Sequence, residues 1–440
     1  MRSIKKIFSL IIVMFIVTGC NNTTETTEKN EISSAEDLIA SIEEQEKSTQ
    51  KESLEETGED KNNKIDDNKE IETVENEIDD EDSSKEEDSN SKDLTTITLK
   101  AVGDIMAHNI QNQYAYNKGG GTYDFSDSFI YLKDFISDSD IAIGNYETTT
   151  NPNLEYTGFP RFNTPPEFID AIKDAGFDVL ATANNHSLDT EVEGLISTID
   201  HIEERGLDYI GSQKDGSDRI LYKDVDGIKL AFLAYTYGAN GRENLLEVRE
   251  EIPELNYLND EKIESDIKSA KAKGADFVIV YPHWGIEYQS LPNERQVNLG
   301  RDMIEWGADL VIGNHPHVVE PYEYVEASDG RTGFIAYALG NFISFQNLEN
   351  NNDIRTEQSV AYEIELSKDQ SNGAKEISSV KAHPIWVGVT YNDYGTSVQN
   401  YIATDFLDGG KYYEYVDEVK RDRIRKANDM TLETIDGGIN

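Results

Sequence analysis

A layered α/β domain is the fold class that the sequence predicts from about residue 95 onward. Apolar, strand-like runs alternate with helical patterns over most of this region, which is typical of helices packed on a β-sheet. Near the end, strand patterns at Ser359–Leu366 and Val380–Gly388 follow one another without a clear helix between them, which indicates a sheet of mixed character. We find no internal repeat and no second domain boundary, so residues 94–440 are expected to form one domain.

The first half of this region contains three strand-like runs, each ending at polar residues. They are Ile97–Val102 before Gly103 and Asp104, Asp140–Gly144 before Asn145, Tyr146 and Glu147, and Phe177–Ala183 before Asn184, Asn185 and His186. Apolar residues at helical spacing predict helices over Glu167–Ala175 and Glu193–Arg205. Gly206 is a stop signal for the second helix.

The second half repeats this style. Strands are predicted over Lys229–Tyr235, Asp276–Tyr281, Asp309–Ile312 and Phe334–Leu339. Amphipathic helices are predicted over Asp260–Lys273 and Asn293–Trp306, each followed by glycine. Polar residues again follow the strands, because His283 comes soon after the second of them and Asn341 soon after the last.

The N-terminus is typical of a targeting segment, residues 1–20. Arg2, Lys5 and Lys6 precede an apolar run, Ile7–Val17, that is short for a bilayer span. The run leads to a small residue and Cys20, the only cysteine of the chain, in a pattern that resembles the lipobox of bacterial lipoproteins. This predicts lipidation at Cys20 and a membrane-anchored, extracytoplasmic protein. The alternative is an ordinary secretory signal that ends near a cysteine.

Residues 21–93 are expected to be a disordered acidic tether. They hold 27 acidic and 8 basic side chains and no aromatic residue, so they cannot bury enough apolar surface to fold. The whole chain carries a net charge of −46, and the remaining region is acidic too. This charge argues against nucleic acid as a partner.

The loop Gly313–His317, with the sequence Gly-Asn-His-Pro-His, is the strongest candidate for a metal site. Two imidazoles one residue apart on a tight loop can point at neighbouring metal positions, because Pro316 fixes φ and cannot relax into a helix. Neutral imidazole is a common ligand for zinc, iron and similar ions. An isolated His-x-His would more often be a surface turn, but three other strand-end loops here have a similar build.

Six motifs in order carry a family resemblance. They are Gly103–Asp104, Asn145–Glu147, Ala183–Asp189, His283–Tyr288, Gly313–Val318 and Leu339–Phe342. Together they resemble the CapA family of poly-γ-glutamate capsule synthesis proteins, a branch of the calcineurin-like metallophosphoesterase superfamily, over roughly residues 97–346. The resemblance implies a four-layer α-β-β-α sandwich with a metal site at the strand ends.

The resemblance also implies roles for individual residues. His186 would be the general acid that protonates a leaving oxygen, and Glu147 would stand where a bridging aspartate usually sits between two metals. One or two divalent ions (zinc, manganese or iron) would be held by Asp104, Glu147, Asn185, His283, His315 and His317. Two departures from the superfamily bear on the number of ions: Met106 replaces the histidine of the usual Asp-x-His, with His108 the nearest imidazole, and Glu147 is longer than aspartate.

Each site residue has a simpler alternative. Arg161 could bind an anionic substrate group through its guanidinium fork or form a salt bridge. Glu287 could line the pocket or pack, and Asn341 could contact substrate or close a turn. Asn185 and Asp189 could cap the following helix.

Three functions remain open from the sequence. The first is a surface lipoprotein that acts in poly-γ-glutamate capsule synthesis or export and has a metal-dependent hydrolase-like site for a phosphoester or amide bond. The second is a non-catalytic accessory or anchoring component whose partners would be polyglutamate synthesis and export proteins. The third is a binding lipoprotein that has kept the fold and lost the chemistry.

Overall fold

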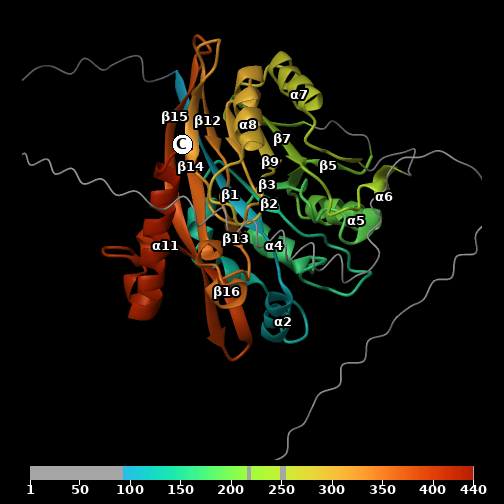
Figure 1. Cartoon of the computed structure of the whole chain (residues 1–440), viewed down its shortest axis with the longest axis vertical. Coiled ribbons are helices and arrows are strands. Elements are labelled where there is room, and N and C mark those ends of the chain that lie inside the picture. Colours follow the sequence, from blue (N-terminus) through green and yellow to red (C-terminus); the bar gives the residue numbers. More distant parts are fainter. Residues whose placement is uncertain (1–92, 216–219, 248–253, 440) are drawn as a thin grey trace, which may run out of the picture. The chain divides into compact units, whose positions relative to one another are not determined.

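Two β-sheets packed face to face form the core of the folded region (Figure 1). The structure, a computed structural model, describes residues 93–215, 220–247 and 254–439, which all fall in the unit Glu86–Asn440. The predicted signal peptide with Cys20 and the acidic segment up to residue 92 lie outside the described residues.

The first sheet has a parallel half and an antiparallel half that meet at its central strand, β1. β2, β3 and β4 continue from β1 in parallel, whereas β14, β15 and β16 continue on the other side in antiparallel fashion. In spatial order the strands are β16 (Gly395–Ile402), β15 (Lys375–Asn392), β14 (Gln358–Asp369), β1 (Leu94–Ile105), β2 (Ile141–Tyr146), β3 (Val179–Ala181) and β4 (Asp208–Ile210), and β13 (Asn341–Ile343) also pairs with β1. The predicted mixed character of the sheet is confirmed.

The second sheet is parallel at its centre and antiparallel at its edges. β12, β10, β9 and β7 are parallel neighbours, and β11 and β6 close the two edges as hairpin partners. The strands in order are β11 (Tyr322–Glu326), β12 (Thr332–Ala336), β10 (Leu310–Ile312), β9 (Phe277–His283), β7 (Ile228–Thr236) and β6 (Leu221–Val225). β5 (Ser212–Gln213) and β8 (Glu254–Leu255) form a separate small pair.

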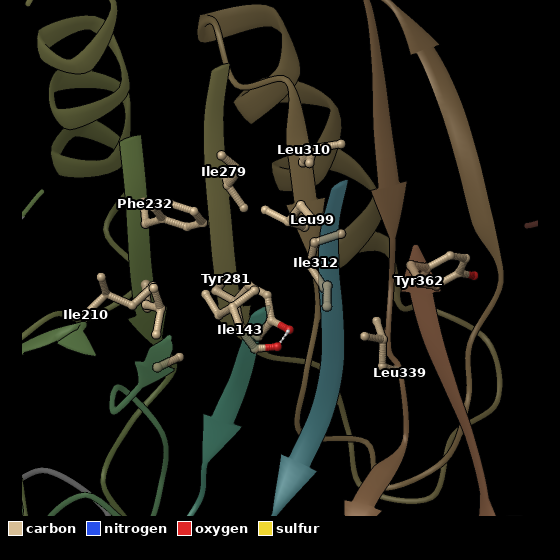
Figure 2. Packing of buried hydrophobic residues seen from close by; sticks show 14 of the residues in the cluster. Leu99, Ile143, Ile210, Phe232, Ile279, Tyr281, Leu310, Ile312, Leu339 and Tyr362 are labelled. Carbon is tan, nitrogen blue, oxygen red and sulfur yellow. Dashed lines mark hydrogen bonds between the residues drawn. The ribbon is translucent and has the colours of Figure 1, made fainter. Parts of the chain in front are cut away.

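The central strands β7 and β9 are almost entirely apolar because both faces of the sheet are buried there. Along β7, Phe232 points into the space between the sheets, whereas its neighbours Ala231 and Leu233 point outward. Figure 2 shows this inner layer, in which Leu99 of β1 lies against Ile279 and other side chains of the second sheet. Continuous apolar runs in the sequence therefore correspond to central strands.

Helices cover both outer faces, which gives the predicted four-layer α-β-β-α sandwich. α3 and α4 pack on the outer face of the first sheet, and α7 and α8 on that of the second sheet (Figure 1). α10 and α11 pack on β15 and β16, and α11 adds Ile435 to the cluster between the sheets. The α-helices are α2 (Asn109–Lys118), α3 (Lys133–Ser137), α4 (Glu167–Asp174), α5 (Glu191–Glu204), α6 (Asn244–Glu247), α7 (Asp260–Ala272), α8 (Glu294–Trp306), α9 (Leu348–Asn351), α10 (Ala403–Phe406) and α11 (Glu418–Asp436). In the described part of the chain, no helix combines the length and apolar character that a membrane span requires.

Candidate metal centre

The predicted metal ligands lie together at one edge of the sandwich, because each follows the carboxyl end of a parallel strand. The first sheet contributes oxygen ligands and the second contributes imidazoles. Asp104 is in β1, and Glu147 and Asn185 follow β2 and β3. His283 ends β9, and the loop after β10 carries His315 and His317.

Asp104 and the loop after β10 are joined directly. His317 Nδ1 lies 3.1 Å from Asp104 Oδ2, and the backbone N–H of His315 donates to the same oxygen at 3.3 Å. The other oxygen of Asp104 accepts a hydrogen bond from Asn145 Nδ2 at 2.8 Å. A single carboxylate thus fixes the loop of one sheet against a strand of the other.

Glu147 is common to two groups of potential ligands. The first group is Glu147, His315 and His317, and the second is Glu147, Asp104 and His283. In each group, one potential ligand atom from every residue lies within 4.8 Å of the others. Glu147 Oε1 lies 3.5 Å from His283 Nε2 and 3.8 Å from His317 Nε2. The carboxylate is therefore shared by the two groups of potential ligands.

The charge state of these groups suits a cation. Glu147 is completely buried, and neither of its oxygens accepts a hydrogen bond from the part of the chain that the structure describes. Burial together with the neighbouring Asp104 raises its pKa well above its usual range. Burial, with a contribution from His317, lowers the pKa of His315 to about 3. Burial also lowers the pKa of His283 well below its usual range. Both imidazoles are therefore neutral at physiological pH and have a lone pair to offer.

The spacing of the donor atoms matches that of ligands on one ion. Ligands at right angles around a cation ~2.1 Å away are ~3.0 Å apart. Two atom pairs have this spacing. His317 Nδ1 lies 3.1 Å from Asp104 Oδ2, and His283 Nε2 lies 3.0 Å from Asn185 Oδ1. His315 Nδ1 is also buried without a hydrogen bond. The residues present therefore fit a divalent cation.

The imidazoles of the loop are held by an unusual backbone. His315 and His317 have φ of +104° and +59°, in the left-handed region that non-glycine residues adopt at a cost of about 1–3 kcal/mol each. Gly313 begins the loop where a Cβ atom would lie 1.9 Å from the carbonyl oxygen of Tyr337. Trp284 Nε1–H donates to that same oxygen at 2.9 Å. The close approach explains why glycine occupies position 313.

His186 is oriented by a buried carboxylate. Its Nδ1–H donates to Asp189 Oδ2 at 2.7 Å, and that oxygen also accepts the backbone N–H of Phe162 at 2.6 Å. The edge of the Phe162 ring packs against the imidazole, with centroids 4.8 Å apart. With Nδ1 used in this way, Nε2 is the nitrogen left for chemistry.

Sequence comparison places this fold and site among known proteins. The family model for "Bacterial capsule synthesis protein PGA_cap" matches residues 98–346. The chain belongs to the PGA_cap family. It is 31% identical over 297 residues to "PGA biosynthesis protein CapA" of Bacillus subtilis (strain 168), covering 65% of this chain and 72% of that protein. It is 32% identical over 256 residues to "Capsule biosynthesis protein CapA" of Bacillus anthracis, covering 56% of this chain and 59% of that protein.

Solved structures similar to this PGA_cap chain carry phosphoesterase titles. One is a calcineurin-like phosphoesterase, YfkN, from Bacillus subtilis, with a TM-score of 0.39 and 16% identity, covering 77% of this chain and 98% of that chain. Another is a phosphatase from Mycoplasma pneumoniae, with a TM-score of 0.39 and 12% identity, covering 66% of this chain and 94% of that chain.

The three predicted substrate-binding residues differ in where they lie in this PGA_cap chain. Arg161 donates through Nε to the backbone carbonyl of Asp189 at 2.8 Å, so it adjoins the residue that orients His186 and forms no salt bridge there. Glu287 is exposed and is close enough to Glu147 to influence its pKa. Asn341 is completely buried, and its Nδ2 donates to three acceptors, including the carbonyl of His317. This arrangement favours the alternative for Asn341, that of holding a turn.

The first departure from the superfamily pattern, at Met106, is also visible in the structure. Met106 is 1% exposed and belongs to the apolar interior. The nearest imidazole, His108, belongs to neither group of potential ligands. Its Nδ1 accepts the backbone N–H of Phe345 at 3.2 Å, and its backbone N–H donates to Gln111 at the start of α2. His108 is thus engaged in holding the chain around α2.

Two side chains at the centre of this site were given no role from the sequence: Tyr237, which no prediction named, and Asn145, which was named only as part of a motif. Tyr237 follows β7 and its ring lies 4.6 Å from that of His315 and parallel to that of His283. Burial and the nearby Glu287 raise the pKa of Tyr237 to about 12, so the half-exposed phenol keeps its proton. Asn145 links the two sheets, since its Nδ2 lies 3.2 Å from His283 Nδ1. Both follow the strand-end rule that identified the other residues.

Proposed function

We propose that this chain is a metal-dependent hydrolase-like surface protein that acts in poly-γ-glutamate capsule synthesis or export. The observation that carries the proposal is the buried Glu147 carboxylate, without a hydrogen bond and shared by two groups of potential ligands. The names of the Bacillus relatives, which refer to PGA and capsule biosynthesis, support the polymer as the biological context.

The chemistry would be hydrolysis of a phosphoester or amide bond. A bound divalent cation would supply Lewis acidity and hydroxide near neutral pH. His186 would donate the proton on Nε2 to the leaving oxygen or nitrogen, because its Nδ1 is already committed to Asp189. Asp189 would hold the imidazole in the productive tautomer, and the edge of Phe162 would limit rotation of the ring.

Zinc, manganese and iron all suit the mixed set of imidazole, carboxylate and amide donors. One or two ions would be held by Asp104, Glu147, Asn185, His283, His315 and His317. The position beside Asp104 would have one imidazole fewer than in the superfamily pattern, because Met106 is packed into the interior. We therefore expect that position to be the weaker of the two.

A non-catalytic accessory role is the second candidate. The buried Met106 favours it, because a weakened second position would impair clamping of the attacking and leaving oxygens. Relatives from Mycobacterium tuberculosis that are 22% identical over 236 residues are named "Probable polyglutamine synthesis accessory protein". In that role the metal would serve structure or polymer binding, and synthesis and export proteins would be the partners.

Metal content of the purified full chain tests the site first. We expect one to two divalent ions per chain by elemental analysis, with loss of both in the His315→Ala/His317→Ala double variant. Hydrolysis of phosphoester and γ-glutamyl substrates would then separate the two candidates. A folded protein that takes up no ion from a saturating mixture of zinc, manganese and iron would refute the metal-dependent function.

Anchoring through a lipid on Cys20 is proposed from the sequence pattern alone. Replacement Cys20→Ala is expected to release the protein from the membrane fraction into the medium, because no acyl chain could be attached at position 20. A conservative Arg2→Lys variant, which keeps the charge of the N-terminal region, serves as the control. Unchanged membrane retention of the Cys20 variant would contradict the lipoprotein assignment.

A further inference from the structure

A second polar cavity lies on the outer face of the first sheet, between the two groups of helices that cover it. α3 covers one side and α10 the other, and the cavity has a volume of about 590 Å3. Small-molecule sites have volumes of roughly 300–1,000 Å3. The cavity residues differ from those of the metal centre, which follows the carboxyl ends of the strands.

The floor of this cavity is a row of charges across three neighbouring strands. Lys100 of β1 is the direct cross-strand partner of Glu363 of β14, which in turn is the partner of Lys381 of β15. Lys100 is 2% exposed, forms an ion pair with Glu363 at 3.5 Å and donates to the backbone carbonyls of Phe135 and Asp138. Its charge is therefore neutralised within the protein.

His383 is the side chain that this network leaves unsatisfied. It lies two residues after Lys381 on β15 and is 7% exposed, and its buried Nε2 has no hydrogen bond among the described residues. The carboxylate of Glu363 is 3.5 Å away, at the limit of a hydrogen bond. Burial, with a contribution from Lys381, lowers the pKa of His383 to about 4. A neutral imidazole that offers both a donor and an acceptor nitrogen thus lines the cavity.

The charged groups at the mouth are of both signs. Lys411 and Asp405 form an ion pair at 3.3 Å, so their two charges neutralise each other. Lys381 has no ion pair in the described part of the chain, and the same holds for the carboxylates of Asp134 and Asp138, which lie on or after α3. A purely anionic ligand would be repelled by these carboxylates, and a purely cationic ligand by the lysine.

We propose that this cavity binds a small zwitterionic ligand, an amino acid or short acidic peptide with a free ammonium group. Lys381 would receive a carboxylate, the carboxylates of α3 would receive the ammonium, and His383 would hydrogen-bond to the ligand at the floor. The inference does not depend on the proposed function, but a γ-glutamyl peptide is a ligand of this class.

The test is titration calorimetry of the full chain in EDTA, so that the metal centre cannot bind the ligand. The probes are L-glutamate and γ-glutamyl-glutamate, with glutarate (no ammonium) and putrescine (no carboxylate) as controls. We expect binding of the two zwitterions and at least tenfold weaker binding of both controls. Equal binding of glutarate would overturn the assignment, as would binding of none of the probes at millimolar concentration.

Variants place the ligand in this cavity. Lys381→Gln is expected to weaken binding about 10–100-fold, the loss typical of one charge-assisted hydrogen bond. Lys426→Gln, which changes an exposed lysine of α11, should leave binding unchanged. Unaltered binding in Lys381→Gln would overturn the proposal. Binding that appears only when metal is restored would also overturn it, because it would assign the ligand to the metal centre.

Discussion

Replacement of Glu147 by Gln tests the assignment of this residue as the shared ligand. The substitution keeps the shape of the side chain and removes its charge. Without metal, the buried Glu147 has its pKa raised by burial and by Asp104, so folding at neutral pH must either bury a charge or take up a proton, and both cost free energy. We therefore expect the metal-free variant to be more stable than the metal-free wild type, by about 1–3 kcal/mol.

Metal should reverse part of this difference. At a free metal concentration of about 100 times Kd, binding to the folded state alone stabilises a protein by about 2.7 kcal/mol. If the variant binds about a hundredfold more weakly, the same concentration stabilises it by only about 0.4 kcal/mol. The metal-dependent increment should thus fall by about 2.3 kcal/mol, although the variant gains stability in EDTA.

Denaturant unfolding of the wild type and of Glu147→Gln, each in EDTA and in excess manganese, measures how much the metal stabilises each protein. Asp266→Asn is the matched control, because Asp266 is also buried but interacts with Tyr235 and Lys262 on the outer side of the second sheet. It should change stability equally with and without metal. A full manganese increment in Glu147→Gln would refute the assignment of Glu147 as a ligand.

Three further predictions concern neighbouring features. Asp189→Asn should lower kcat on a hydrolysed substrate at least a hundredfold and leave metal content unchanged, since the carboxylate orients His186 rather than a metal; loss of metal would contradict this. Burial lowers the pKa of His108 to about 4, below the value of 6.5 in the unfolded chain. The stability that the neutral imidazole contributes to the folded state is therefore complete above pH 6.5 and is lost as pH falls toward 4. Between pH 7 and pH 5 in EDTA, the free energy of unfolding of His108→Gln should therefore fall by about 1–2 kcal/mol less than that of the wild type. The same pH dependence in both proteins would refute the reasoning. Gly313→Ala should destabilise the protein by about 2 kcal/mol or more and lower metal content, because the new Cβ would meet the Tyr337 carbonyl; an unaltered metal content would show that the loop can shift.

Much of the fold follows from apolar periodicity, and the misses have physical causes. The strand predicted over Phe334–Leu339 ends at Ala336 in the structure, because the backbone N–H groups of Tyr337 and Leu339 bond to loop carbonyls instead of to a neighbouring strand. α11 was not predicted because its buried side includes Arg421 and Thr431, which weakens the apolar stripe that identifies a helix.

The residues of the candidate site could be predicted from the sequence where their position depends on the end of a strand. Residues at or shortly after strand ends lie close together as expected, His283 and Asn185 among them. The role of Asp189 could not be read in this way. Capping of the next helix was one alternative for it, but its carboxylate bonds to His186 and to the backbone of Phe162, which lies 27 residues away. Such a contact depends on how a loop folds back, which local patterns do not encode.

The division of ligands between the two sheets has a consequence for assembly of the site. The first sheet supplies only oxygen donors and the second only nitrogen donors, so neither half of the chain alone can form the mixed coordination sphere. A bound ion would cross-link the two sheets at one edge of the sandwich. If one sheet slid past the other, the carboxylate and imidazole ligands would move apart. Occupancy of the ion would then report on the alignment of the two sheets.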